Sequence, residues 1–391
     1  MKADPTTAGG SDVLIIGGGL QGLSSALQLA RRGCSVRLLE ADYCGRHASG
    51  VNAGGVRTVY RHMAEVPLSV AARTLWHNLA DLVGENPGFV ASGQLKLAET
   101  EAELERLRQR VEQLNALGYT HEELVGPEVV RELVPALTPN ISGAIWAADD
   151  GYAYPYGVVT AFRHACERLG VIIHEGTPAD RIERIGERWQ VDTPSQRFDA
   201  DFLVNTAGAW AGEFARQVDE PVPLEAVGLM LMVTTRVAPF VKPVLGATGR
   251  ALSFKQFANG TVVIGGGLTC AADPVAGHGE VDMMKLATSA RTVTDLFPHL
   301  RGIAINRAWA GVEGFMPDHI PVISASRTRP NLVHAFGFSA HGFELSPIVG
   351  QIVAELLLDG RSTQPIAPFA IDRFAAAPAA ASPSSSQSLA A

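Results

Sequence analysis

The chain has 391 residues, a formal net charge of −8 and 47% hydrophobic residues. That length accommodates two domains with a large core. The negative charge, without any run of basic residues, argues against nucleic acid as a partner. No apolar stretch reaches the length of a membrane span, and residues 1–12 lack the apolar segment of a secretory signal. The cysteines have neither disulfide nor metal-site spacing, which favours a reducing, cytoplasmic location. They are Cys34, Cys44, Cys166 and Cys270.

Residues 11–40 predict a dinucleotide-binding unit. An apolar strand, Val13–Ile16, is followed by a glycine-rich turn, an amphipathic helix and a second strand that ends at Glu40. Three glycines have the spacing that brings backbone amides and a helix N-terminus to a pyrophosphate: Gly17, Gly19 and Gly22. A carboxylate at position 40 can accept a hydrogen bond from a ribose hydroxyl and would repel the negative charge of a 2′-phosphate. FAD or NAD therefore fits this site, and NADP does not.

The rest of the chain alternates between helical and strand patterns. A capping box at Thr100–Glu103 opens a helix, and further helices are expected at 155–169, 283–296 and 346–358. Short β-like runs fill residues 221–270. Within them, Gly265–Gly267 resembles a second nucleotide turn, but no helix follows, so we expect a sheet strand and a loop.

We therefore expect an α/β (α+β) protein of two domains, in which a Rossmann-like domain is interleaved with an antiparallel-sheet domain. The Rossmann-like domain is assigned to 11–88, 146–220 and 305–374, and the second domain to 89–145 and 221–304. Low-complexity composition predicts flexible tails at 1–10 and 375–391.

Five further segments, in this order, resemble motifs of the D-amino acid oxidase superfamily of FAD-dependent oxidoreductases. They are His47–Gly55, Asp150–Pro155, Val204–Trp210, Ala308–Gly311 with Pro317–Pro321, and Gly337–Phe343. The likeness is to the branch of glycine oxidase, sarcosine oxidase and the sarcosine oxidase β-subunit, and it covers about residues 11–372. The resemblance implies FAD as cofactor, with 11–88, 146–220 and 305–374 as the FAD domain and the remainder as the substrate domain.

The resemblance also implies a set of cofactor-binding residues. They are Gly17, Gly19, Leu20, Gln21, Gly22, Glu40, Ala41, His47, Ser49, Asn52, Ala53, Gly54, Gly55, Ala179, Ala207, Gly208, Trp210, Gly311, Gly337, Ser339, His341, Gly342 and Phe343. The last helix is expected to aim its N-terminal amides at the reduced flavin. Some relatives attach FAD covalently through a His or a Cys, but Asn52 and Gly311 stand at those positions, so non-covalent FAD is predicted.

The substrate side departs from the pattern of the relatives. Val263 stands where sarcosine oxidases place an oxygen-activating Lys, and Lys255 is either its substitute or a solvated strand lysine. Glu313 and Glu344 replace two cationic anchors. They face a cationic substrate end, leave room for a larger N-substituent, or pair with local arginines such as Arg307.

Two arginines remain as candidates for the substrate carboxylate. Arg57 and Arg61 resemble an arginine-bearing stretch of the family, although the spacing differs by one residue. A guanidinium suits this role because it pairs with a carboxylate through two hydrogen bonds. The alternative is that both are surface arginines at the start of a helix.

The resemblance implies oxidation of a small-molecule amine or amino acid, of N-substituted glycine or imino acid type, to an imine that hydrolyses, with hydride passing to flavin N5. The polar candidates for catalysis are His47, Tyr152, Tyr154 and His341. Two alternatives are a D-amino acid or polyamine-type amine oxidase or dehydrogenase and an FAD-binding subunit of a multi-subunit enzyme. An NAD-binding dehydrogenase would be colourless. O2 or a redox partner as electron acceptor, and a homo-oligomer or a partner subunit, are left open. No metal-ligand cluster is evident.

Overall fold

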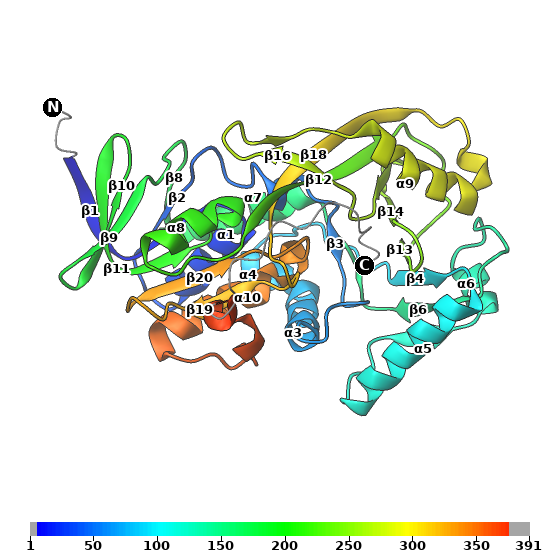
Figure 1. The fold of residues 1–391 in the computed structure, drawn as a ribbon, viewed down its shortest axis with the longest axis horizontal. Coiled ribbons are helices and arrows are strands. Elements are labelled where there is room, and N and C mark those ends of the chain that lie inside the picture. The colour runs from blue at the N-terminus through cyan, green and yellow to red at the C-terminus, as the bar shows by residue number, and fades with distance from the viewer. Residues whose placement is uncertain (1–5, 375–391) are drawn as a thin grey trace.

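The computed structural model describes residues 6–374, which form two large sheets and a short two-stranded sheet, with helices packed around them (Figure 1). The expected α/β class with an interleaved antiparallel domain is confirmed. The predicted tail at 375–391 lies outside the described residues. Residues 6–10 differ from the prediction, because they already belong to the first strand and pair with β11, starting at Thr6 opposite Gln196.

The first sheet carries the dinucleotide-binding unit. Its strand order is β19-β20-β11-β1-β2-β8, and a β9–β10 hairpin extends it beside β11. The bounds are β1 Thr6–Ile16, β2 Val36–Leu39, β8 Ile172–His174, β9 Arg181–Ile185, β10 Arg188–Asp192, β11 Gln196–Asn205, β19 Val322–Ala325 and β20 Leu332–Phe336. The strands from β20 to β8 run parallel, and β19 is antiparallel. In the antiparallel pair of β10 and β11, Trp189 lies opposite Ala200.

Strand β1 has apolar residues on both faces because both faces of this sheet are covered. Val13 and Ile15 pack in the core beneath helices, whereas Leu14 and Ile16 face the β9–β10 hairpin. The helices on the first face are α1 Leu20–Arg31, α3 Val66–His77, α4 Leu79–Val83, α7 Pro155–Arg168 and α10 Gly342–Asp359; α8 Ala211–Gln217 packs on the other. An apolar run without polar alternation is typical of such a doubly covered strand.

The second sheet has the order β17-β16-β12-β15-β14-β13-β4-β6-β5, with β18 also paired to β12. Its strands are β4 Gln94–Ala98, β5 Glu123–Val125, β6 Gly143–Ala147, β12 Glu225–Thr234, β13 Val244–Ala247, β14 Ser253–Gln256, β15 Val262–Gly265, β16 Thr269–Asp273, β17 His278–Gly279 and β18 Ile305–Phe315. Strand β18 pairs with β12 along its whole length. Residues 305–315, which the sequence analysis placed in the Rossmann-like domain, thus extend the second sheet.

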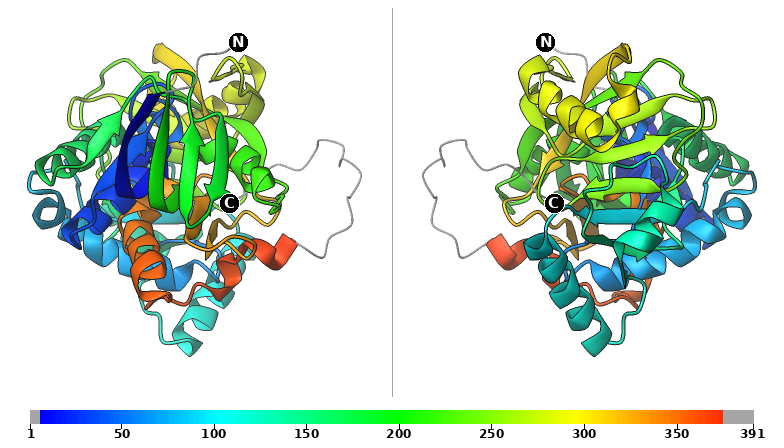
Figure 2. Two further views of the ribbon diagram at one scale, coloured as in Figure 1. Left: turned by 90° about the vertical axis from the view of Figure 1, so that its left-hand side faces the viewer. Right: turned by 90° about the vertical axis from the view of Figure 1, so that its right-hand side faces the viewer.

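The two faces of the second sheet differ. Leu95, Phe254 and Ile264 point to one face and pack with helix α9, Met283–Leu296. Figure 2 shows α9 over this sheet at one end of the molecule, with α5, Glu101–Ala116, below. Residues offset by one position, such as Lys96 and Lys255, point to the opposite face and line a cavity. Helix α6, Pro127–Leu133, closes the far edge.

Three predicted local features are tested by the structure. Thr100 accepts a hydrogen bond from the Glu103 amide at the start of α5, while the Glu103 carboxylate accepts from the Glu99 amide. The Gly265–Gly267 turn follows sheet strand β15, as expected. The last helix begins at Gly342 rather than at residue 346, because Ser346 and Pro347 already lie in its first turns.

Candidate active site

The glycine-rich turn is held by backbone contacts that admit only glycine. Gly17 has φ +104°, and a Cβ there would lie 2.4 Å from the Thr206 carbonyl oxygen. A Cβ on Gly22 would lie 1.9 Å from the Gly17 oxygen. Strand β1, the turn and α1 are therefore packed against β11 as closely as a backbone can be, which is the arrangement that brings α1's N-terminus to a phosphate.

Glu40 closes one end of this cradle. Its carboxylate accepts hydrogen bonds from the Gly18 amide at 2.7 Å and from the Asp42 amide at 2.9 Å. Burial raises its pKa, and the two amides oppose that rise. The acceptor predicted for a ribose hydroxyl thus lies beside the glycine turn on the wall of the cavity.

A cavity of about 1120 Å³ runs from the glycine turn to the second sheet. Most of the predicted cofactor residues line it: Gly17, Gly19, Gln21, Glu40, Ala41, His47, Ser49, Asn52, Ala53, Gly54, Gly55, Ala179, Ala207, Gly208, Trp210, Gly337, Ser339, His341, Gly342 and Phe343. Leu20, Gly22 and Gly311 lie behind its wall: a Cβ on Gly311 would come 2.6 Å from Val51.

The segment His47–Gly55 is fixed from three sides. Trp309 Nε1 donates to the Val51 oxygen at 2.7 Å, and Asn52 Oδ1 accepts from the Gly54 amide at 2.7 Å. Lys255 Nζ donates to the Ala53 oxygen at 2.5 Å. These contacts hold the edge of the cavity rigidly, as a site that must place two reactants side by side requires.

The loop before α10 is strained. Ser339 and Ala340 are consecutive non-glycine residues with φ of 48° and 71°. Such conformations cost on the order of 1–3 kcal/mol each and persist only where surrounding contacts enforce them. Here Ser339 bonds to Gly314 and Met316, and His341 bonds to Glu65. The strain lies in the part of the loop that faces the cavity.

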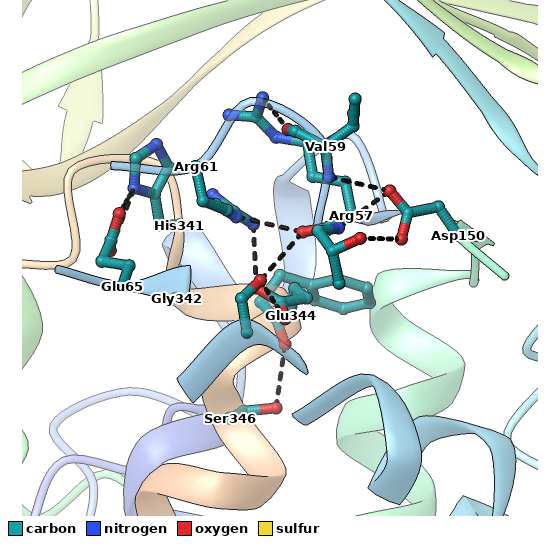
Figure 3. A network of polar contacts seen from close by, with 12 residues as sticks. Arg57, Val59, Arg61, Glu65, Asp150, His341, Gly342, Glu344 and Ser346 are labelled. Carbon is teal, nitrogen blue, oxygen red and sulfur yellow. Dashed lines mark hydrogen bonds and ion pairs between the residues drawn. The ribbon is translucent and has the colours of Figure 1, made fainter. Parts of the chain in front are cut away.

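His341 is a neutral histidine of fixed tautomer. Its Nδ1 lies 2.8 Å from a Glu65 oxygen. Burial, together with the charge of Arg61, lowers the pKa of His341 to about 4. The Nδ1–H therefore donates to Glu65, which leaves Nε2 as a hydrogen-bond acceptor. Figure 3 shows this pair beside the arginines of the site.

Arg61 and Glu344 form a buried ion pair that connects the segment after β3, Gly55–Val56, to the start of α10 (Figure 3). The two side chains lie 3.0 Å apart, with 2% and 0% of their surface exposed. Ser69 donates to Glu344 at 2.9 Å, and Trp76 Nε1 donates to its carbonyl oxygen at 2.7 Å. Arg61 is thus no surface arginine. Glu344 pairs with it, not with Arg307, and lies behind the cavity wall.

Other substrate-side candidates line the cavity. Arg57 is half-buried, and desolvation together with the charge of Arg61 lowers its pKa to about 9. Lys255 is 1% exposed, so the alternative of a solvated lysine is wrong. It lies opposite Val263 in the β14–β15 register, and burial with Arg57's charge lowers its pKa to about 7. Glu313 accepts a bond from the Ala340 amide, and burial raises its pKa to about 7.

The two tyrosine candidates lie outside the cavity lining. Tyr152, on β7 Gly151–Tyr152, is buried and packs edge-on against Phe257 with ring centroids 5.1 Å apart. Tyr154 stacks on the same ring at 4.4 Å and is 44% exposed. Both have structural contacts here, whereas His47 and His341 reach the cavity.

Sequence reasoning missed several cavity residues contributed by β4 and its surroundings: Gln94, Lys96, Tyr60 and Arg110. Lys96 is 3% exposed, and its ammonium lies 4.5 Å from the centre of the Tyr60 ring. The alternation of Gln94, Leu95, Lys96 and Leu97 was the available signal, but it is the pattern of a half-solvated strand. Only its position in the fold turns the polar face toward a cavity.

The comparisons with known proteins agree with this geometry. A family model described as DAO, FAD dependent oxidoreductase, matches residues 12–356. The chain belongs to this family. The glycine oxidase of Bacillus subtilis is 26% identical over 371 residues, covering 93% of this chain and 97% of that protein. The sarcosine oxidase subunit beta of Rhodobacter capsulatus is 26% identical, covering 93% and 88%. The solved structure of L-proline dehydrogenase from P. horikoshii matches with a TM-score of 0.87 at 25% identity, over 95% and 99% of the two chains.

The protein is therefore an FAD-dependent oxidoreductase, as the sequence motifs predicted. The residues present fit this cofactor: the Gly17 turn admits no side chain, and the buried Gln21 Oε1 on the cavity wall has no partner among the described residues. Among the helices of residues 6–374, none combines the length and apolarity that crossing a membrane requires. In the same range no three His, Cys, Asp or Glu side chains are arranged to hold a metal ion.

Removal of Glu344's charge is expected to destabilise the fold. Glu344→Gln leaves the Arg61 charge buried without its partner, so the free energy of unfolding should fall by about 3 kcal/mol. Urea unfolding of the FAD-loaded protein measures this. The control is Glu105→Gln, which removes an exposed carboxylate paired with Arg108 and should change stability by less than about 0.5 kcal/mol. Equal effects of the two variants would contradict the role of the buried pair.

Stability should fall on mild acidification. Burial lowers the pKa of both His47 and His341 to about 4, against 6.5 as the ordinary value. The unfolded chain therefore takes up protons first between these values. Each histidine should then lower the free energy of unfolding by about 1 kcal/mol per pH unit as the pH falls from 6.5 towards 4. Urea unfolding from pH 7 to pH 5 should show a shallower decline for His341→Gln than for wild type; parallel curves would refute a neutral His341.

Proposed function

We propose that the protein oxidises a secondary amine or an amino acid, of N-substituted glycine or imino acid type, to an imine that water then hydrolyses. One observation is the main support for this proposal. A single cavity joins the dinucleotide cradle at Gly17 to buried cations around Arg57. A substrate carboxylate bound by those cations would be held in the same enclosed space as the cofactor, and such fixed proximity is a major source of rate enhancement.

Bound FAD supplies the acceptor for the hydride that leaves the substrate carbon. The chain supplies orientation. Arg57 is the candidate partner of the substrate carboxylate, through paired guanidinium hydrogen bonds. The neutral His341, with Nδ1–H directed to Glu65, offers Nε2 as acceptor for an amine N–H. An amine bound in its neutral form needs no strong base, and burial of the site favours that form.

The relatives support an amino acid or amine as substrate, since one is a glycine oxidase and another a sarcosine oxidase subunit. The cations in the cavity argue against a polyamine as substrate, because they would repel its positive charges. A D-amino acid is compatible with them. Because the second relative is named as a subunit, a second candidate function is an FAD-binding subunit that works with a partner chain. O2 and a redox partner are both consistent acceptors of the electrons.

Anaerobic flavin reduction tests the function. Purified protein that carries FAD should lose its absorbance near 450 nm when mixed with a suitable amine that bears a carboxylate. The panel contains sarcosine, glycine, iminodiacetate, D-proline, D-alanine and an opine, with a putrescine derivative as the cationic control. Fast recolouring in air would identify an oxidase, and slow recolouring a dehydrogenase. Protein that holds FAD but is reduced by no amine would refute the proposal for the chain alone.

FAD is expected to be bound non-covalently. None of the four cysteines lines the cavity, and the flavin-loop positions hold Val51 and Asn52 instead of a histidine. Acid precipitation should therefore release all FAD into the supernatant and leave a colourless pellet. An intact mass of the denatured chain equal to that of the polypeptide is the second readout. A yellow pellet with the added mass of FAD would contradict the prediction.

A further inference from the structure

Three cations on the substrate side of the cavity, two of them buried and one half-buried, form no ion pair within the described residues. Arg57, Lys96 and Lys255 line the cavity together, and no carboxylate within the described residues forms an ion pair with any of them. Arg57 only donates weakly to the Val59 oxygen at 3.5 Å, and Lys255 donates to the Ala53 oxygen. An unpaired buried charge costs several kcal/mol, on the order given by ion desolvation, so such a cluster is retained where a ligand supplies the opposite charge.

The second sheet places the two lysines on one face. Lys96 on β4 is in register with Gly246 on β13, and Gly246 is in register with Ser253 on β14. Lys255 lies two residues after Ser253, so it points to the same side. The missing side chain at Gly246 leaves room between them: the Lys96 Cδ lies 3.6 Å from where a Cβ on Gly246 would be. Neighbouring strands are about 4.8 Å apart, which separates the two lysine-bearing strands by roughly 10 Å.

Arg57 stands near both lysines. After burial, its charge is the largest contribution that lowers the pKa of Lys96 and of Lys255, each to about 7. The three cations thus surround one space and are not three separate features.

The acidic groups around this space are already occupied. Asp150 accepts from the Thr58 and Val59 amides, Glu65 pairs with His341, and Glu344 pairs with Arg61. Two more carboxylates lie toward the β4 side. Glu122 pairs with Arg110, and Glu103 accepts from the Glu99 amide. Glu313 lines the cavity too, and its carboxylate accepts a hydrogen bond from the Ala340 amide.

One carboxylate leaves Lys96 without a counter-ion in contact. Arg57 alone suffices for the α-carboxylate of an amino acid, because a guanidinium matches a carboxylate with two donors. Lys96 then remains buried on the far side of Gly246, over the Tyr60 ring, with no carboxylate of the described residues within ion-pair distance. A second anionic group on the substrate would meet it there.

We propose that the substrate is an amine bearing two carboxylates, such as an N-(carboxyalkyl) amino acid, with one carboxylate bound at Arg57 and the other at Lys96. Lys255 lies between the substrate space and the Ala53–Gly55 segment. Its ammonium adds to the positive potential at this end of the cavity. This inference rests on the proposed amine oxidation and names its substrate class.

Binding of two unreactive analogues tests the proposal. Thiodiacetate carries two carboxylates around a sulfur atom, and (methylthio)acetate carries one. Titration of the FAD-loaded protein, followed by the change in flavin absorbance at pH 7, gives the Kd of each. Thiodiacetate should bind at least about tenfold more tightly than its monocarboxylate analogue, since a second charge-assisted contact is gained. Equal affinities would overturn the proposal.

Variants locate the second carboxylate. Lys96→Met keeps most of the length of the side chain and removes its charge, so it should reduce the preference for thiodiacetate to about twofold or less and leave the Kd of (methylthio)acetate unchanged. Lys96→Arg should retain the preference. Lys242→Met, at an exposed lysine before β13, is the matched control and should behave as wild type. Equal weakening of both analogues by Lys96→Met, with Lys96→Arg no better, would show a structural role and refute the assignment.

Substrates separate this inference from the proposed function. Iminodiacetate should reduce the flavin at lower concentration than its monoamide, which has the same shape with one charge fewer. Reduction by sarcosine as efficient as by iminodiacetate would refute the dicarboxylate and leave amine oxidation intact. Reduction by no amine, with thiodiacetate still bound tightly through Lys96, would refute the oxidation and retain the dianion site.

Discussion

The Arg61–Glu344 ion pair is the contact on which the geometry of the site depends. It joins the segment that carries Arg57 to the first turn of α10, and Ser69 and Trp76 of α3 bond to the same glutamate. Arg61 Nε also donates to the Arg57 carbonyl oxygen at 3.0 Å, so the backbone of Arg57 is fixed by the same network. Because both charges are buried, loss of either partner leaves the other uncompensated, and the loop cannot shift without that cost.

This network also explains why the strained loop before α10 is stable. Glu65 lies at the N-terminal end of α3, next to residues bonded to Glu344, and it fixes His341. Ser339 and Ala340 are thus held in left-handed conformations between two anchored points, β18 and α10. The energy of burial contacts elsewhere stabilises a local conformation that the loop residues themselves disfavour.

The cavity between the sheets has two chemically different ends. Around Gly17 it presents backbone amides and a helix N-terminus, which suit a phosphate and need no cationic side chain. At the other end it presents Lys96 and Lys255 of the second sheet together with Arg57, which follows β3. Low-dielectric surroundings strengthen the attraction of such groups for an anion.

The cofactor site could be predicted in detail from local sequence, and the substrate site could not. Gly17, Gly22 and Glu40 act through their own strand, turn and helix, so a contiguous pattern specifies them. Glu344 and Arg61, in contrast, are 283 residues apart in the chain, and no local pattern indicates that they pair. Tyr152 and Tyr154 follow a family-like motif, yet their rings pack on Phe257 outside the cavity lining.

Lys96 shows most clearly which properties the local sequence determines and which depend on tertiary contacts. Its strand alternates polar and apolar residues, which determines that Leu95 and Leu97 enter a core and that Gln94 and Lys96 share the other face. Whether that other face meets water or an enclosed cavity depends on the glycine turn, the Arg57 segment and α10, all contributed by distant parts of the chain. The sequence by itself determined the FAD cradle and the two-sheet architecture, because short-range spacing encodes them. Only the tertiary structure decided which charges are buried together, because burial and charge proximity arise from contacts between residues far apart in the chain.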